Sequence, residues 1–467
     1  MKDLWRFVKS SGIYFVGTVL TKLISFLLLP LYTSYISPEG YGTYDLSLNY
    51  IMFFCSVLYL DIWSGILRFM YDYTGEDRKK PISSGLAIFF CSTILYCVTL
   101  FAAMPYLKLE YPVLLLLYGM LMNFQTLAGY IARGFGRNVL YTSAGIISSL
   151  VTVLFNILLL VHFHMDYSAL LVASIIGYLV NILIIVIGVR EPGAFSLKHF
   201  DRKIFKDMLI FSLPLCVNSV AYWFLTSYNR LVVVEHFGPA ANGFYAIAGR
   251  FGSMVTLFTT CFQMAWQELS FSKTAKSQNL DDFYTTAINN YIKSMGAGLI
   301  LLIPTIFIIY PLMVNESYDM GKTLVPLYLM GTILSTIGAF LGNAFTAIKK
   351  NNLLFWTMLA GSVSNVICMH LLVNRLGIQA SNVALMIGFF MTCLTRVILF
   401  KKCVRLRMDY KSIAILLLAF LGVWYVYTVG NIWTNLLALL GAVLISVYLF
   451  RDVLREMFGL LSQRKKA

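Results

Sequence analysis

Three basic residues lie inside long apolar runs of the sequence: Lys22, Arg230 and Arg250. A charge at the bilayer centre costs roughly 2.5–3.5 kcal/mol on insertion scales, so such a residue usually faces a wet cavity. Arg230 and Arg250 fall at similar depth in neighbouring runs, and an anion between two guanidinium groups would relieve their repulsion. The residues therefore predict an anion-binding cavity. The alternatives are that each side chain reaches out to the surface or that the arginines pair with Asp45 or Glu235.

Four further charged residues lie within or at the ends of apolar runs. Asp61 and Arg68 are seven residues apart, which places them on one helix face two turns apart, and we expect a structural pair or a gate contact. Glu268 near the inner end of its run is a candidate gate or proton-binding residue. Arg396, near the inner end of another run, is expected to extend to the membrane surface.

Pro30 and Pro214 each interrupt a predicted span. Each removes a backbone hydrogen bond and permits a bend in the helix. Both are candidate hinges, and a static kink is the alternative.

The composition shows which elements position these residues. Of 467 residues, 59% are hydrophobic and 12% are charged, whereas soluble domains have about 25% charged residues. This excludes soluble and disordered chains and predicts an all-α polytopic membrane protein. Apolar runs give fourteen predicted spans, at residues 11–36, 43–66, 83–107, 112–132, 141–162, 168–189, 206–235, 243–270, 285–314, 322–347, 353–373, 379–400, 411–428 and 433–452.

The basic residues predict the orientation of these spans. With a cytoplasmic N-terminus, 29 of the 36 lysines and arginines fall on inner segments and 3 on outer loops, and the other 4 lie inside spans. Lys and Arg collect on cytoplasmic loops, so both termini are predicted to be cytoplasmic and the protein to lie in the cytoplasmic membrane. The net charge of +15 is then explained by topology, and no nucleic-acid partner is predicted.

A short motif occurs twice at an offset of 201 residues. Pro38, Gly42 and Tyr44 match Pro239, Gly243 and Tyr245. Both copies join the first two spans of a predicted half, where Pro and Gly make a tight turn. The repeat predicts two parallel six-helix lobes, residues 1–200 and 201–402, followed by two further spans and a basic tail at 403–467.

The motifs together resemble one transporter family. They comprise Leu29-Pro30-Leu31-Tyr32, Pro38-x-x-x-Gly42-x-Tyr44, Leu213-Pro214, Asn229-Arg230 and Gly243-x-Tyr245-x-x-Ala248-x-Arg250. In this order they resemble the polysaccharide transport branch of the MOP exporter superfamily, whose members include flippases for lipid-linked oligosaccharides. The resemblance implies two lobes in a V-shaped, alternating-access arrangement.

The resemblance also implies a substrate and its site. The substrate would be an undecaprenyl-pyrophosphate-linked oligosaccharide moved from the inner to the outer leaflet, with a lipid bilayer around the protein and polysaccharide polymerase and assembly proteins as partners. Lys22, Arg230 and Arg250 would bind the pyrophosphate. Relatives often have Asp-Arg where this chain has Asn229-Arg230, so Asn229 removes a carboxylate that could hold a coupling ion.

Other functions remain open at this point. A MATE-type drug or cation exporter has the same implied fold, but the three buried cations argue against a cationic substrate. A lipid II flippase would take a related anionic lipid. A membrane-bound glycan polymerase or acyltransferase would need a large external loop or an intramembrane His/Asp pair, and the sequence has neither. We expect no enzyme, no cofactor and no metal site; coupling to Na⁺, H⁺ or the membrane potential is left open.

Overall fold

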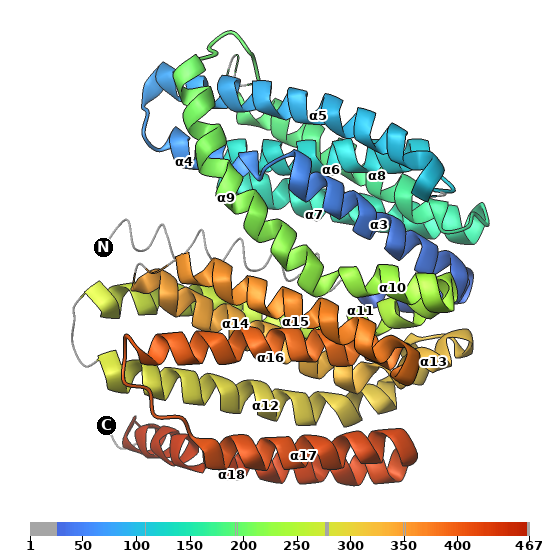
Figure 1. Cartoon of the computed structure of the whole chain (residues 1–467), viewed down its shortest axis with the longest axis vertical. Coiled ribbons are helices and arrows are strands. Elements are labelled where there is room, and N and C mark those ends of the chain that lie inside the picture. The colour runs from blue at the N-terminus through green and yellow to red at the C-terminus, as the bar shows by residue number, and fades with distance from the viewer. Residues whose placement is uncertain are drawn as a thin grey trace. The chain divides into compact units, whose positions relative to one another are not determined.

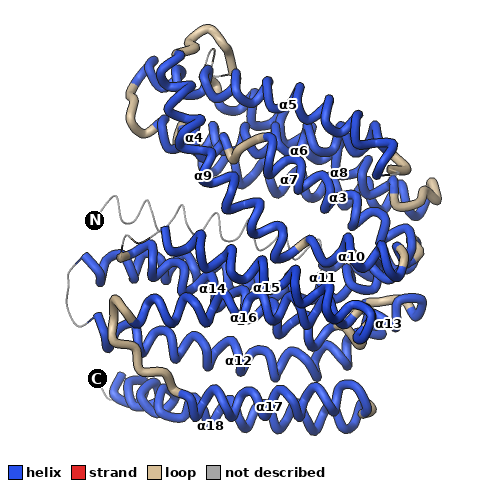
Figure 2. The backbone as a smooth tube through the Cα atoms, in the orientation of Figure 1, coloured by secondary structure: helices blue, strands red, loops and turns tan. Residues whose placement is uncertain are grey.

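The computed structural model describes residues 26–464 except 108, 192, 194, 276–279, 349 and 351. Side chains from residue 452 onward, and several in the stretch 258–275, also lie outside the description. The described chain is built of helices joined by short loops and contains no strand (Figure 1, Figure 2). The predicted all-α membrane fold is confirmed.

The helices follow the predicted apolar runs closely. Their bounds are α2 (Leu29–Tyr35), α3 (Pro38–Leu58), α4 (Ile62–Met70), α5 (Lys79–Leu107), α6 (Pro112–Gly134), α7 (Asn138–Ile157), α8 (Ser168–Val189), α9 (Arg202–Thr226), α10 (Tyr228–Phe237), α11 (Pro239–Ala275), α12 (Leu280–Met313), α13 (Asp319–Lys322), α14 (Val325–Ala347), α15 (Asn352–Leu376), α16 (Gln379–Lys401), α17 (Tyr410–Val429) and α18 (Ile432–Arg464). Short turns of helix lie at Gly75–Arg78, Leu158–His162 and Glu316–Tyr318.

The described residues contain eleven helices long and apolar enough to cross a membrane, or twelve when the bent pair α3–α4 counts as one span. The predicted count of fourteen is therefore not confirmed. The two remaining predictions are 11–36, most of which lies outside the described residues, and 243–270, which falls in α11. Most span boundaries agree because a long apolar run bounded by polar residues leaves little choice to a backbone that must satisfy its own hydrogen bonds in lipid.

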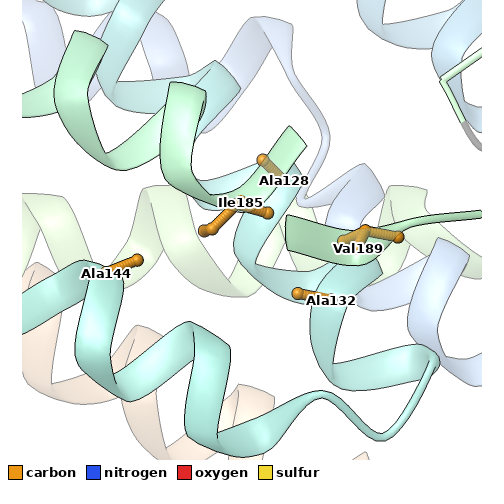
Figure 3. Packing of buried hydrophobic residues seen from close by; sticks show 5 residues of the cluster. All are labelled: Ala128, Ala132, Ala144, Ile185 and Val189. Atoms are coloured by element: carbon orange, nitrogen blue, oxygen red, sulfur yellow. The ribbon is translucent and has the colours of Figure 1, made fainter. Parts of the chain in front are cut away.

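The chain divides into two compact units, Met1–Ala246 and Ile247–Ala467. In the first unit α6, α7 and α8 pack around small side chains that let the helices approach closely (Figure 3). The cluster consists of Ala128, Ala132, Ala144, Ile185 and Val189. Helix α9 packs on α3, α4 and α5 in the same unit. The lobes predicted from the repeat, and their V-shaped arrangement, stay predictions.

The spans that carry the candidate hinges are interrupted in different ways. The helix breaks at Leu28, so that Pro30 stands in the first turn of α2. Pro214 lies inside the continuous helix α9, and the break in that span comes later, at Ser227. A hinge role for either proline stays a prediction.

One prediction about a buried charge was wrong. Arg396 on α16 does not extend to the surface: it is 4% exposed and donates to the Gly338 carbonyl on α14 and to Thr357 Oγ1 on α15 at 3.1 Å. Gly338 and Gly342 present no side chain to the guanidinium, which leaves it room against α14. Neighbouring helices thus satisfy a group that an isolated span would have to expose.

In the second unit an extended segment, residues 402–409, runs along α12; we call it the strap. Its buried residues Val404 and Leu406 alternate with the exposed Arg405 and Arg407. The strap's backbone is held by polar side chains that recur every fourth residue on one face of α12. They are Asp281, Thr285 and Asn289, and Lys293 continues the row.

Asp409 ends the strap and fixes the start of α17. It pairs with Lys293 at 2.6 Å, and its side chain accepts from the backbone N–H of Ser412 at 3.1 Å. Hydrogen bonds from Lys293 and then from Ser412 lower the pKa of Asp409 to about 2. The stabilisation is complete above the ordinary aspartate pKa of about 3.9 and is lost only as the pH falls towards 2, so the strap stays docked throughout the physiological range.

Asn289→Ala should loosen the strap. Asn289 accepts from the Asp409 N–H at 3.0 Å and donates to the Arg407 carbonyl at 2.7 Å, so its loss removes two hydrogen bonds worth about 1–2 kcal/mol together. Limited proteolysis of the purified protein should cleave within 402–409 faster than in wild type. Asn290→Ala, at the exposed neighbouring position, is the matched control. Equal cleavage of both variants would show that the Asn289 hydrogen bonds do not hold the strap.

Candidate functional site

The two copies of the sequence motif meet in the first unit. Helix α3 begins at Pro38 and α11 at Pro239, and the two helix starts cross. A Cβ on Gly42 would overlap the Pro239 carbonyl oxygen, and a Cβ on Gly243 would overlap the Pro38 carbonyl oxygen. The contact is reciprocal, because each glycine lies against the carbonyl of the proline that begins the other helix. We call this contact the glycine crossing.

A polar cluster lies directly beside the glycine crossing. Asn242 is fully buried, and its Nδ2 donates to the Gly42 carbonyl at 2.8 Å and to Asp45 Oδ2 at 3.1 Å. The same carboxylate oxygen forms an ion pair with the Nη1 of Arg230 on α10. Asp45 thereby connects α3 to both α10 and α11.

Arg230 is held in a defined position. Its side chain is 13% exposed and that of Asp45 is 21% exposed, so the pair is largely withdrawn from solvent. The guanidinium carbon lies 5.5 Å from the centre of the Tyr245 ring, within cation–π range. Removing one partner of such a pair leaves a poorly solvated charge and costs about 3–5 kcal/mol when burial is complete. Here we expect the lower end of that range.

The other two predicted anion-site residues are Lys22 and Arg250. Lys22 lies outside the described residues. Arg250 lies on α11 in the second unit and is partly buried, and its carbonyl accepts from Ser253 Oγ. Arg230 pairs with Asp45, which was one of the alternatives to an anion site. A pyrophosphate-binding role for Lys22, Arg230 and Arg250 stays a prediction.

Of the four candidate gate and coupling residues, the structure describes the side chains of Asp61, Arg68 and Asn229. Arg68 pairs with Asp72 at 2.6 Å, so the expected pair with Asp61 was wrong. The physical reason is that a partner one turn away on the same helix is easier to reach than one two turns away. Asn229 is fully buried on α10. Glu268 falls in α11, where its side chain is not described.

Asp61 lies instead at the break between α3 and α4. The two helices are bent by 47°, and the break holds two consecutive non-glycine residues in the left-handed region, Leu60 and Asp61 at φ 54° and 52°. Such a conformation costs about 1 kcal/mol or more per residue. The bend brings Asp61 to the wall of a cavity of about 470 Å³ in the first unit.

Sequence reasoning missed the role of two residues. It treated Asp45 only as an alternative partner of Arg230, and it did not single out Asn242. A signal was present: both flank the repeated motif, Asp45 three residues after Gly42 and Asn242 directly before Gly243. A charged residue beside a glycine that admits another helix is a candidate to reach across the contact.

Comparison with known proteins identifies the family of this chain. A family model described as polysaccharide biosynthesis protein matches residues 7–267, which is more than half of the chain and includes both copies of the motif. The chain belongs to this family.

Two relatives of this chain come from Haemophilus influenzae. A protein of the Lsg locus is 22% identical over 256 residues, covering 53% of this chain and 62% of the relative. A membrane protein is 20% identical over 346 residues, covering 72% of this chain and 83% of the relative. The chain thus spans less than two thirds of the first relative.

Solved structures establish the fold. The lipid II flippase MurJ in an inward closed conformation aligns with a TM-score of 0.71 at 16% identity, covering 96% of this chain and all of that one. An inward-facing MATE transporter of the MOP superfamily aligns with a TM-score of 0.68 at 15% identity, covering 84% and 97%. This family member therefore has the fold of the MOP superfamily and is a multi-pass membrane protein.

Gly243→Ala should separate the glycine crossing. The added methyl group has no room against the Pro38 backbone, so α3 and α11 must move apart, and the Asn242 hydrogen bond to Gly42 is strained. We expect a loss of about 2–3 kcal/mol, measured as a lower melting temperature in detergent. Gly145→Ala on α7 is the control, because nothing lies near its Cβ position and alanine favours a helix. Equal melting temperatures for the two variants would refute the close contact.

Proposed function

We propose that this protein is a transporter that moves undecaprenyl-pyrophosphate-linked oligosaccharide units from the inner to the outer leaflet of the cytoplasmic membrane for surface polysaccharide synthesis. The observation that carries the proposal is the Asp45–Arg230 ion pair, because it offers an anionic substrate a defined cation inside a membrane-spanning unit of a polysaccharide biosynthesis protein. The similarity to MurJ, described as a lipid II flippase, supports an anionic lipid as the substrate class.

The pyrophosphate competes with Asp45 for Arg230 in this mechanism. Without substrate the carboxylate neutralises the guanidinium and holds α3 against α10 and α11. A pyrophosphate offers more charge than one carboxylate and can bind the planar guanidinium with two oxygens. The exchange frees Asp45 and removes one of the contacts that hold the glycine crossing. Substrate binding is thereby linked to opening at the predicted external end.

Lys22 and Arg250 complete the proposed pyrophosphate site. Both are basic residues in predicted spans, where an uncompensated charge is costly. Ala substitution of each of the three residues should abolish export of the glycan in cells while the protein level stays normal. Export at the wild-type level by all three variants would refute the site.

Residue 229 bears on how transport is energised, because Asn229 has no carboxylate that could bind a coupling proton or Na⁺. A neutral amide at this fully buried position cannot take up a proton near neutral pH, so we propose that coupling does not run through residue 229. Asp61, Arg68 and Glu268 remain candidate gate or coupling residues, and both termini are proposed to be cytoplasmic. Neither an enzymatic activity nor a cofactor is part of this proposal.

A charge exchange separates a substrate role of Arg230 from a structural one. In proteoliposomes that hold a fluorescent undecaprenyl-pyrophosphate oligosaccharide, Arg230→Ala should reduce transport at least tenfold, because a charge-assisted phosphate contact is worth about 1.5–3 kcal/mol. The double variant Asp45→Arg with Arg230→Asp should regain part of the thermal stability, since the ion pair is restored although the Asn242 hydrogen bond to residue 45 is not, and it should not regain transport. Arg375→Ala, an exposed arginine far along the chain, is the control. Recovery of transport in the double variant would show that the pair is structural only.

A further inference from the structure

The first unit contains a cavity that the pyrophosphate mechanism does not use. It measures about 470 Å³, which is within the range of small-ligand sites, and lies between α3, α4, α6 and α9. Its lining is mixed: Met52, Cys55, Ser56, Asp61, Trp63, Met122, Asn123, Thr126, Asn218, Ser219, Tyr222, Trp223, Thr226 and Ser227. Among these lining residues only Asp61 carries a charge, and none is basic.

Two polar side chains in the cavity wall are not used for hydrogen bonds among the described residues. No residue in the described part of the chain forms a hydrogen bond with the side chains of Asn218 and Ser219 on α9, although a polar side chain in a membrane-spanning helix usually bonds to a neighbouring helix. Asn218 is exposed to the cavity. By contrast Asn123 uses its Nδ2 for the Gly119 carbonyl at 2.7 Å. Asn218 and Ser219 therefore offer donors and acceptors to a ligand.

The strained backbone beside the cavity places Asp61 in the cavity wall. Leu60 and Asp61 keep left-handed conformations without being glycine, and the resulting bend places Asp61 among the lining residues. A straight helix through this region would avoid the cost. Strain of this kind accumulates at functional sites, where the surrounding structure holds it in place.

Aromatic rings supply the remaining part of the wall. Trp223 is held by a bond from its Nε1 to the Asn49 carbonyl at 3.0 Å and by its contact with Phe53, so its ring is fixed. Tyr222 is 46% exposed, and Trp63 lies on α4 beside Asp61. Rigid aromatic faces next to amides and hydroxyls suit a ligand with apolar C–H faces and a rim of hydroxyl groups.

We propose that this cavity binds sugar residues of the transported oligosaccharide, an inference that rests on the proposed function. The absence of a basic lining residue makes the cavity unsuitable for the pyrophosphate, and a lipid tail would leave the amides and hydroxyls in its wall without hydrogen-bond partners. A neutral polyol satisfies both kinds of group at once. Asn218, Ser219 and Asp61 bond to sugar hydroxyls, and the rings of Trp63 and Tyr222 contact the sugar ring faces.

Affinity measurements on the purified protein in nanodiscs test the subsite. One probe is the undecaprenyl-pyrophosphate oligosaccharide isolated from the native host, and the other is undecaprenyl pyrophosphate without sugar. Wild type should bind the glycan form about tenfold more tightly. Asn218→Ala combined with Ser219→Ala should remove this difference while leaving the affinity for the bare lipid unchanged, which also shows that the variant is folded. Asn290→Ala, exposed on α12, is the matched control.

The outcomes distinguish this inference from the function on which it rests. If wild type binds neither lipid, the proposed function is wrong. If wild type binds both lipids equally, or if the double variant keeps the preference for the glycan form, the subsite is wrong and the function stands. A third result is that tetraphenylphosphonium abolishes the preference for the glycan form in wild type but not in Asp61→Asn. That result would identify an organic-cation site and overturn the assignment to sugars.

Discussion

The close approach of two backbones at Gly42 and Gly243 is the constraint on which the first unit depends. Each glycine lies against the carbonyl of the proline that starts the opposing helix, so neither position tolerates a side chain. Lipid does not drive helices together by hydrophobic burial, so close contact must come from small residues and polar bonds. Here both are present, because Asn242 and Asp45 bond directly beside the glycines.

The charged pair at the crossing follows from that geometry. Only when the backbones are this close can Asp45 on α3 reach both Asn242 and Arg230. A largely buried ion pair contributes little net stability, but it is costly to break on one side only. Such a pair suits a contact that must hold firmly in one state and be released by a competing anion in another. The proposed exchange with a pyrophosphate uses this property.

The sequence predicted the helices well, and the side-chain partners poorly. Apolar runs placed α8 at 168–189 and α16 within one residue of its observed end, since in lipid the backbone leaves few alternatives. Two side-chain partnerships and one backbone break depended on geometry that a linear pattern lacks. Arg68 pairs with Asp72, and Arg396 donates to the Gly338 carbonyl. The helix breaks at Leu60 and Asp61, where no glycine or proline indicates a break. The repeated motif was visible in the sequence, but not that its two copies touch.

Binding of undecaprenyl pyrophosphate to wild type, Asp45→Asn, Arg230→Ala and the double variant tests the central claim most directly. If the carboxylate and the lipid compete for one guanidinium, Asp45→Asn tightens binding by about tenfold, Arg230→Ala weakens it, and the double variant binds like Arg230→Ala alone. Binding by Asp45→Asn that is as weak as that of Arg230→Ala would contradict the account, because the pair would then only hold the fold together.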